Sequence, residues 1–420
     1  MCRKKNKFMD IENEITADNE AYQQSLALIQ RCRTPAGFVA SPIDIDNYAR
    51  VWTRDGVITG LAALVSGEKD LVKAFDDTLS TIAMNQGKHG EIPSNVSVDG
   101  KEVSYGHLAG RVDAALWYVI GVCALLNHTK RASQNVRFLL SVERALYLAE
   151  CWEYNDRGFL YTPISGNWAD EYVQQGYVLS DLLLYEMALR SAGQVFMNKE
   201  WQKEAAVLRR MLEVNYWPRE TLVEDSLVYH PLAYREQLKR GEPQYWLPAF
   251  SPAGYVSYFD GMAHALALIT NLGDVEQQQQ TATYVHGLEA QVGNALLPAF
   301  WPVIKPGDPQ WAALEANHLY EQIKNQPYLY HNGGLWPMLT GLYAVGLAQH
   351  QQKDRAVQLL SAINAANVQG REDRQWEFAE YHHGQTYAPM GTHYQAWSAA
   401  AAVLAHHAIW HHSIPWPLSV

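Results

Sequence analysis

Two acidic residues far apart in the sequence lie in aromatic surroundings. Asp170, followed directly by Glu171, falls within residues 166–172 (GNWADEY), and Glu380 falls within residues 376–384 (WEFAEYHHG). Hydrolysis of a glycosidic bond needs a pair of carboxyl groups, because one protonates the leaving oxygen while the other activates water or attacks. Apolar neighbours raise the pKa of a carboxyl, as a general acid requires. The alternative for the first pair is an exposed acidic turn.

A second cluster, residues 47–56 (NYARVWTRDG), places Trp52, Arg54 and Asp55 just before a predicted helix. The indole offers a stacking face, and the guanidinium and carboxylate offer donors and acceptors for the hydroxyls of a polyol. Asp55 could instead cap the helix, since Asp is favoured at that position. Asp113, in the segment GRVDAALWY, stands in the first turn of another predicted helix, where the helix dipole also favours a carboxylate.

A third cluster, residues 327–337 (PYLYHNGGLWP), groups His331, Asn332 and Trp336 around a pair of glycines. Glycines allow the backbone to approach a ligand closely. A proline at the start of a helix is ordinary, but it explains neither the aromatic residues nor the histidine. These clusters together supply stacking faces and hydrogen-bonding groups of the kind that bind polyols.

The elements that must position these clusters are helical. Apolar residues recur with helical spacing in about twelve stretches, and no run with the alternation of a strand is convincing. The expected helices are 17–32, 56–66, 68–85, 111–127, 138–152, 176–192, 199–214, 260–271, 275–290, 334–350, 353–366 and 394–411.

The connections between these helices alternate between a few residues and long segments, namely 86–110, 153–175, 215–259, 293–333 and 367–393. Loops of this length in a compact domain are usually functional. We therefore expect an all-α fold in which the first helix of each hairpin lies inside and the second outside. Six hairpins would close an (α/α)6 toroid with its site on the long-loop face. Periodicity alone also permits an open solenoid, but no fixed-period repeat is visible.

One domain accounts for most of the chain. We expect an N-terminal extension over 1–16, a catalytic domain over 17–412 and a tail over 413–420. The N-terminus MCRKKNK leads into acidic residues instead of an apolar stretch, so we expect a cytoplasmic protein. The longest apolar runs, such as 399–405, fall short of the ~20 residues of a membrane span.

Composition also limits the partners. Lys and Arg number 33 against 44 Asp and Glu, with the signs mixed along the chain, so a nucleic-acid partner is not expected. The four cysteines show no CxxC spacing and are expected to be reduced. His407 and His411 have a zinc-like spacing but lack a third ligand, so we expect no metal, and no motif implies another cofactor. The sequence is compatible with a homo-oligomer.

In this order the clusters resemble the six-hairpin glycoside hydrolases, in particular the alkaline/neutral invertases and the amylo-α-1,6-glucosidase domain of glycogen-debranching enzymes. The similarity covers roughly residues 44–405. The segment YHNGGLWP is similar to the YHNGGxWP signature of the invertases, and VWTRD and VDAALW have counterparts there. WAD resembles the W-M-D of the debranching enzymes, and EY resembles the E-Y-Y of the invertases.

The resemblance implies that Asp170 is the general acid and Glu380 the general base of a single inverting displacement. It also implies that Arg54, Asp55 and Asp113 hold the sugar's hydroxyls and that aromatic side chains wall the pocket. The complete set of expected substrate-binding residues is Trp52, Arg54, Asp55, Asp113, Trp168, Glu171, His331, Asn332 and Trp336.

Two departures from the invertase pattern bear on the substrate. The arginines that follow the acid in invertases are replaced from Glu171 onward, and His382 and His383 stand where invertases carry an acid. The expected substrate is a small α-glucoside: sucrose, a short maltose- or isomaltose-type sugar, or a glucoside of a small acid or polyol. A sugar epimerase or isomerase that uses histidine, and a non-catalytic carbohydrate-binding protein, are the alternatives.

Overall fold

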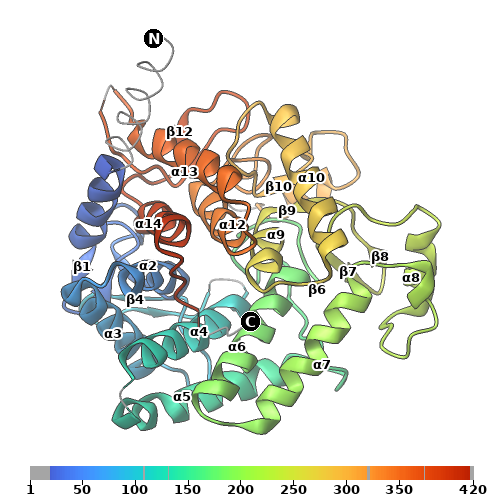
Figure 1. Cartoon of the computed structure of the whole chain (residues 1–420), viewed down its shortest axis with the longest axis horizontal. Coiled ribbons are helices and arrows are strands. Elements are labelled where there is room, and N and C mark those ends of the chain that lie inside the picture. Colours follow the sequence, from blue (N-terminus) through green and yellow to red (C-terminus); the bar gives the residue numbers. More distant parts are fainter. Residues whose placement is uncertain (1–18, 107–108, 131, 319–321, 373, 417–420) are drawn as a thin grey trace, which may run out of the picture.

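A computed structural model describes residues 19–416 apart from 107–108, 131, 319–321 and 373 (Figure 1). The expected extension over 1–16 and the last four residues of the tail lie outside the described residues. All twelve expected helices are found, with shifted ends. The largest shift is at α5, which begins at Ala132 instead of residue 138.

Six inner helices form a closed ring (Figure 1). Each packs against the next in chain order, and the last packs against the first, so the toroid is closed and not an open solenoid. These helices are α2 (Thr53–Ser66), α4 (Val112–Thr129), α6 (Leu179–Val195), α9 (Gly261–Ile269), α12 (Pro337–Gln349) and α14 (Ala396–His411).

An outer layer surrounds this ring. It consists of the helix over residues 19–31 and of α3 (Lys69–Met84), α5 (Ala132–Cys151), α7 (Lys199–Asn215), α10 (Val275–Val292) and α13 (Lys353–Val368). The Tyr22 hydroxyl of the first helix lies 2.9 Å from Nε2 of His407 in α14, so these two helices form the sixth hairpin. In the hairpins whose two helices follow each other through a tight turn, such as α2–α3 and α9–α10, the inner helix comes first and the outer helix second, as expected.

The two layers differ in how their side chains are buried. In α4 every residue from Val112 to Leu126 is buried, whereas α7 buries only one stripe that includes Leu208 and Leu212. Such all-round apolar character is typical of a core helix. α4 is also long and apolar enough to cross a membrane by length and composition alone, but 83% of it is buried inside the fold.

The long loops contain short strands and helices that the sequence did not predict. Their strands have two or three residues each, too few for an alternating pattern to be recognised. Three antiparallel pairs form: β1 (Arg33–Thr34) with β2 (Gly37–Phe38), β9 (Phe259–Asp260) with β10 (Phe300–Trp301), and β11 (Tyr381–His382) with β12 (Pro389–Met390). Two antiparallel sheets have three strands each. In one, β4 (Asn95–Ser97) lies between β3 (Arg50–Trp52) and β5 (Val103–Ser104), and in the other β7 (Ala249–Ser251) lies between β6 (Tyr177–Val178) and β8 (Gly254–Tyr255). The added helices are α8 (Pro231–Leu238), α11 (Trp311–Ala316) and a single 3-10 turn at Glu220–Leu222.

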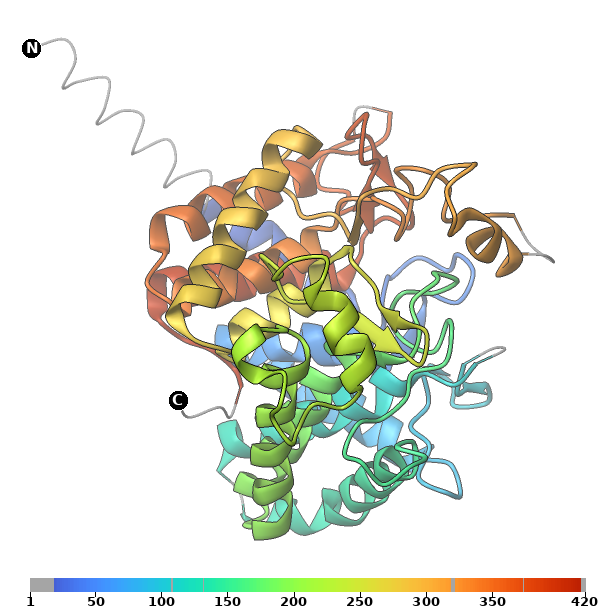
Figure 2. The ribbon, with the colours of Figure 1, turned by 90° about the vertical axis from the view of Figure 1, so that its right-hand side faces the viewer.

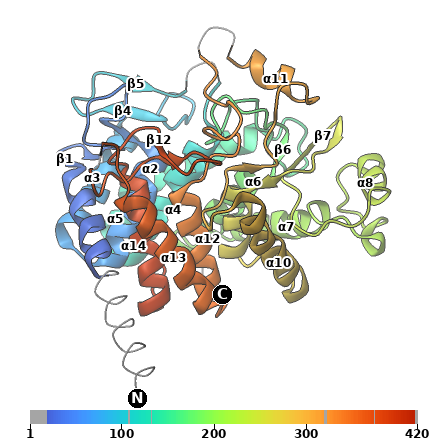
Figure 3. The same cartoon turned by 90° about the horizontal axis from the view of Figure 1, so that it is seen from above.

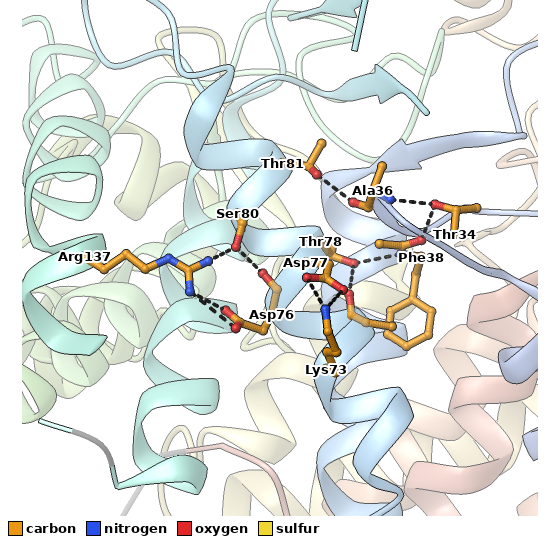
Figure 4. A network of polar contacts seen from close by, with 12 residues as sticks. Thr34, Ala36, Phe38, Lys73, Asp76, Asp77, Thr78, Ser80, Thr81 and Arg137 are labelled. Carbon is orange, nitrogen blue, oxygen red and sulfur yellow. Dashed lines mark hydrogen bonds and ion pairs between the residues drawn. The ribbon is translucent and has the colours of Figure 1, made fainter. Parts of the chain in front are cut away.

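Polar contacts attach the β1–β2 strand hairpin to the outer helix α3 (Figure 4). On α3, Thr78 accepts a hydrogen bond of 2.8 Å from the backbone N–H of Phe38, and Thr81 donates one of 2.7 Å to the carbonyl of Ala36. On the other side of α3, Arg137 of α5 pairs with Asp76 at 3.0 Å. α3 thereby holds both the β1–β2 hairpin and its neighbouring outer helix.

All long connections lead from the end of an outer helix to the start of an inner one. The N-termini of the inner helices therefore share one face with the long loops, as seen from two directions in Figures 2 and 3. Helix N-termini carry partial positive charge, which favours carboxylates nearby. Asp55, Asp113 and Asp181 stand in the first turns of α2, α4 and α6, and Asp260 caps α9.

Candidate active site

A pocket of about 590 Å³ opens on the long-loop face. This volume lies within the ~300–1,000 Å³ typical of small-molecule sites. All the expected site residues line it except Asp113 and Asn332. The full lining is Asp46, Asn47, Tyr48, Trp52, Arg54, Asp55, Arg111, Trp168, Asp170, Glu171, Lys324, Tyr330, His331, Trp336, Glu380 and Trp397.

Glu380 directly precedes β11 and is almost fully buried. Its Oε1 accepts a hydrogen bond of 2.9 Å from the Tyr48 hydroxyl, and its Oε2 accepts one of 3.0 Å from the backbone N–H of Thr392. Burial raises the pKa of Glu380 to about 7, opposed by these two donors and assisted by the charges of Asp55 and Asp170. A carboxyl with this pKa can accept or hold a proton near neutral pH.

Gly391, just after β12, makes room for the Glu380 carboxyl. A Cβ at this position would lie 2.3 Å from Oε2 of Glu380, and the backbone φ of +71° is one that residues with side chains rarely adopt. The β11–β12 hairpin can therefore fold closely over Glu380 only with glycine here.

Asp170 reaches the pocket from the loop between α5 and α6. Its Oδ1 lies 2.5 Å from Nη2 of Arg111, which stands at the N-cap of α4 and also donates to the carbonyl of Ser165. The Asp170 side chain is 22% exposed. The two carboxyls thus have different surroundings, since one faces a guanidinium at the pocket surface and the other is buried under hydrogen-bond donors.

Arg54 forms part of the pocket wall and is held from behind. Its Nη1 donates to Oδ2 of Asp113 at 2.9 Å, its Nε lies 3.9 Å from Asp55, and its guanidinium stacks over Trp397 at 5.6 Å from the ring centroid. Asp113 is 1% exposed and does not line the pocket, so the structure differs from the expectation that it contacts the sugar. Asp113 orients Arg54 instead.

Asp55 lines the pocket and does not cap its helix. α2 begins at Thr53 with Trp52 at the N-cap, so Asp55 is the third residue of the helix, within its first turn. Burial raises the pKa of Asp55 to about 6, while Arg54 lowers it. The Asp55 carboxyl oxygens can accept hydrogen bonds from hydroxyl groups in the pocket.

Stacked rings form another wall of the pocket. The His331 ring lies parallel to Trp336 at 5.1 Å, and Trp168 contacts His331 edge-on at 4.7 Å. Burial lowers the pKa of His331 well below its usual value, so the ring is neutral, with one N–H and one lone pair. Both ring nitrogens are buried, and neither has a hydrogen-bond partner among the described residues.

Asn332 differs from the expectation because it is fully buried behind the pocket. Its Nδ2 donates to the carbonyls of Ile304 and Asn325, and its Oδ1 accepts from the backbone N–H of Ile304. The glycine pair also serves the protein's own packing, since a Cβ on Gly334 would lie 2.2 Å from the carbonyl oxygen of Tyr330. The backbone of this loop therefore packs closely against protein at Gly334.

Several lining residues were missed by the sequence analysis, among them Tyr48, Arg111, Lys324, Tyr330 and Trp397. Most of them lie inside or beside the recognised motifs, but their partners come from other loops. The backbone gives a further signal that only the structure provides. Three lining residues have left-handed φ values: Asp46 (+52°), Glu171 (+60°) and Tyr330 (+48°). Such strained conformations cluster at functional sites.

Comparisons with known proteins agree with this geometry. The profile of the family described as "Alkaline and neutral invertase" matches residues 244–411. Two relatives from Arabidopsis thaliana are a probable chloroplastic alkaline/neutral invertase A, 21% identical over 89% of this chain, and a mitochondrial invertase C, 23% identical over 90%. The chain spans 67% and 64% of their lengths. A solved structure titled "Glycosidase Wild Type" superposes with a TM-score of 0.65, 14% identity and coverage of 94% of this chain and 98% of that one.

The chain is a glycosidase. The resemblance to the alkaline/neutral invertases and the six-hairpin (α/α)6 fold are both confirmed. The glycosidase carries in one pocket the carboxyl pair that the sequence analysis selected.

His382 and His383, which follow Glu380 in the sequence, do not line this pocket, whereas His331 does. Nδ1 of His382 faces the carbonyl of Tyr387 at 3.1 Å, and Nδ1 of His383 accepts from the backbone N–H groups of Gln385 and Thr386. Both rings are therefore engaged in shaping their own hairpin. In the part of the chain that the structure describes, no cluster of three His, Cys, Asp or Glu residues is arranged to hold a metal ion.

Proposed function

We propose that this glycosidase hydrolyses the α-glucosidic bond of a small sugar, either of sucrose type or a short α-gluco-oligosaccharide. The observation that carries the proposal is the convergence of Asp170 and Glu380, from two separate loops, on one pocket of about 590 Å³. Two carboxyls facing one sugar-sized pocket are the arrangement that glycoside hydrolysis needs.

In the proposed mechanism Glu380 is the general base. The Tyr48 hydroxyl and the Thr392 N–H orient its carboxylate, and a pKa raised to about 7 makes it a stronger base than an ordinary glutamate. Asp170 is the general acid that protonates the leaving oxygen. Glu380 activates a water molecule, which displaces that oxygen in a single step with inversion.

The deeper part of the pocket suits the glucosyl unit. Arg54 and Asp55 supply donors and an acceptor for its hydroxyls. The indole of Trp52, which lines the pocket and is partly exposed, offers an apolar face for the ring carbons. Glu171 lies 3.8 Å from Lys324, so a charged pair borders the leaving group, where invertases carry arginines instead of Glu171.

The reverse assignment has one observation in its favour. Burial raises the pKa of Glu380 to about 7, and a raised pKa is what a general acid requires. On that basis Glu380 would carry the proton and Asp170 would act as the base. The two assignments differ in which variant retains activity when the leaving group needs no protonation.

The test is hydrolysis of sucrose, maltose, isomaltose, trehalose and glucosylglycerate by wild type, Asp170→Asn and Glu380→Gln. His286→Ala is the matched control, because its ring is exposed on the outer helix α10 and lies outside the pocket. We expect one glucoside to be cleaved, with both carboxyl variants inactive while folded and the control active. Proton NMR of the first product formed then gives the anomeric outcome.

Cleavage of α-glucosyl fluoride separates the two assignments, because fluoride leaves without general-acid help. Asp170→Asn should retain this activity and Glu380→Gln should lose it. The opposite pattern would reverse the roles. Absence of cleavage across the panel, or carboxyl variants as active as wild type, would overturn the proposal.

A further inference from the structure

We infer that Asn167 and Gln174 form a buried clamp that fixes the loop carrying Asp170 and so positions this carboxyl for proton transfer. The inference rests on the proposed role of Asp170 as the general acid. Neither amide side chain lines the pocket, and both are 1% exposed. They act on the reaction through Asp170 and are positioning residues.

The two amides join the ends of the loop to each other. Nδ2 of Asn167 donates to Oε1 of Gln174 at 2.9 Å, which closes residues 167–174 into a loop with Asp170 near its middle. Oδ1 of Asn167 accepts from the backbone N–H of Ala169 at 3.0 Å, which fixes the turn just before Asp170.

Each end is also attached to the start of an inner helix. Nδ2 of Asn167 donates to Oδ2 of Asp181 in the first turn of α6 at 3.0 Å. Nε2 of Gln174 donates to Oδ2 of Asp260 at 2.8 Å, and Oδ1 of Asp260 caps α9 through the N–H of Ala263 at 3.0 Å. The loop is therefore tied to two helices of the rigid ring.

The loop is also held at Asp170 itself. The Asp170 carbonyl accepts a hydrogen bond of 3.2 Å from Nδ2 of Asn325, which belongs to the loop that carries His331. On either side, Trp168 and Tyr172 are buried, and Tyr172 stacks on Phe300 at 4.1 Å. With its ends and its centre fixed, the segment presents the Asp170 side chain in one direction.

A polar clamp in this position has an energetic consequence. A buried amide without partners is strongly disfavoured, so the two amides are held firmly only in the geometry that satisfies both of them. Displacement of a reacting group by 1 Å can reduce a rate on the order of 100-fold. Loss of one clamp bond should therefore lower proton transfer more than substrate binding.

The test compares two leaving groups in Gln174→Met, which keeps the length of the side chain but removes its hydrogen bonds. With the O-glucoside that wild type cleaves, we expect kcat to fall about 10- to 100-fold while KM changes little. With α-glucosyl fluoride, which needs no general acid, kcat should stay close to wild type. Gln237→Met, at a buried glutamine on α8, is the matched control and should leave both substrates unaffected.

A swapped pair provides the rescue. In Gln174→Glu with Asp260→Asn, the new asparagine can donate to the new carboxylate, which still accepts from Asn167, while its side-chain oxygen still caps α9. This double variant should recover cleavage of the O-glucoside, whereas Gln174→Glu alone should not. If Gln174→Met does not fold, Asn167→Ser tests the other end of the clamp.

Equal loss on both substrates in the clamp variants, or no loss on either, would overturn the inference. Asp170→Asn distinguishes this from failure of the proposed function. If Asp170→Asn itself loses both substrates equally, the assignment of the acid is wrong. If it spares the fluoride while the clamp variants do not, only the clamp is wrong.

Discussion

Replacement of Tyr48 by phenylalanine should change the pH dependence of the reaction in one direction. The Tyr48 hydroxyl donates to Oε1 of Glu380 at 2.9 Å. Burial and the nearby glutamate raise the pKa of Tyr48 well above its usual value, so it remains a donor at every working pH. A donor stabilises the ionised carboxylate and lowers its pKa. Its removal should therefore raise the pKa of Glu380 further above about 7.

The size of the change follows from the strength of the hydrogen bond. A hydrogen bond to a charged group contributes about 1.5–3 kcal/mol. Since 1.36 kcal/mol corresponds to one pH unit, the pKa of Glu380 should rise by roughly one to two units. If Glu380 is the base, the enzyme is active only above this pKa. The acidic limb of kcat/KM should then move upward by the same amount.

The assay is the pH dependence of kcat/KM for the cleaved glucoside. Tyr330→Phe is the matched control, because Tyr330 lines the same pocket and, among the described residues, makes no hydrogen bond to Glu380. The control should leave the acidic limb in place. An unmoved or lowered acidic limb in Tyr48→Phe would refute the reasoning. An upward shift of the basic limb instead would identify Glu380 as the acid, because its proton would then be held to higher pH.

Three further predictions concern the residues around the carboxyl pair. Gly391→Ala should lower kcat by more than about tenfold without unfolding the chain by circular dichroism, because its Cβ would lie 2.3 Å from Oε2 of Glu380. Asp113→Asn should lower the free energy of unfolding in urea by about 3 kcal/mol and raise KM, since it breaks the buried ion pair that orients Arg54; unchanged stability and KM would contradict this. Asp181→Asn should flatten the dependence of Tm on pH, because burial raises the pKa of Asp181 to about 8. That contribution to stability is complete below the unfolded-state pKa of about 4 and is lost as pH rises through about 8, so a wild-type slope retained in the variant would be the contrary result.

The helices were predictable because their apolar stretches are long, although the two layers differ in pattern. The outer helices show the stripe that periodicity detects, whereas α4 is buried on almost every side and is recognised by length and apolar content. Closure of the ring depends on the packing of α14 against α2. These two helices are far apart in the sequence, so no local pattern predicts their contact. The strands could not be predicted, because β3 has only three residues and forms by pairing with β4 from another loop.

The site was predictable to the extent that residue type determines role. Motifs identify polar and aromatic residues beside helix starts, but they do not show which side chain faces the pocket. Asp55 and Asp113 both stand in the first turn of an inner helix next to Arg54, yet only Asp55 lines the pocket. The choice depends on contacts between α2 and α4, which no single segment encodes.

The positions at which the inner helices begin indicate which polar residues lie near the pocket. Since all six inner helices begin on the face that carries the pocket, any polar residue within a turn of such a start can reach the site or the layer beneath it. This rule selects Arg111, which pairs with Asp170, and also Asp181 and Asp260, which anchor the acid loop. None of these three belongs to the set chosen by residue type. The chemistry of the pocket is thus encoded in the motifs, whereas its geometry is encoded in the residues that begin the inner helices.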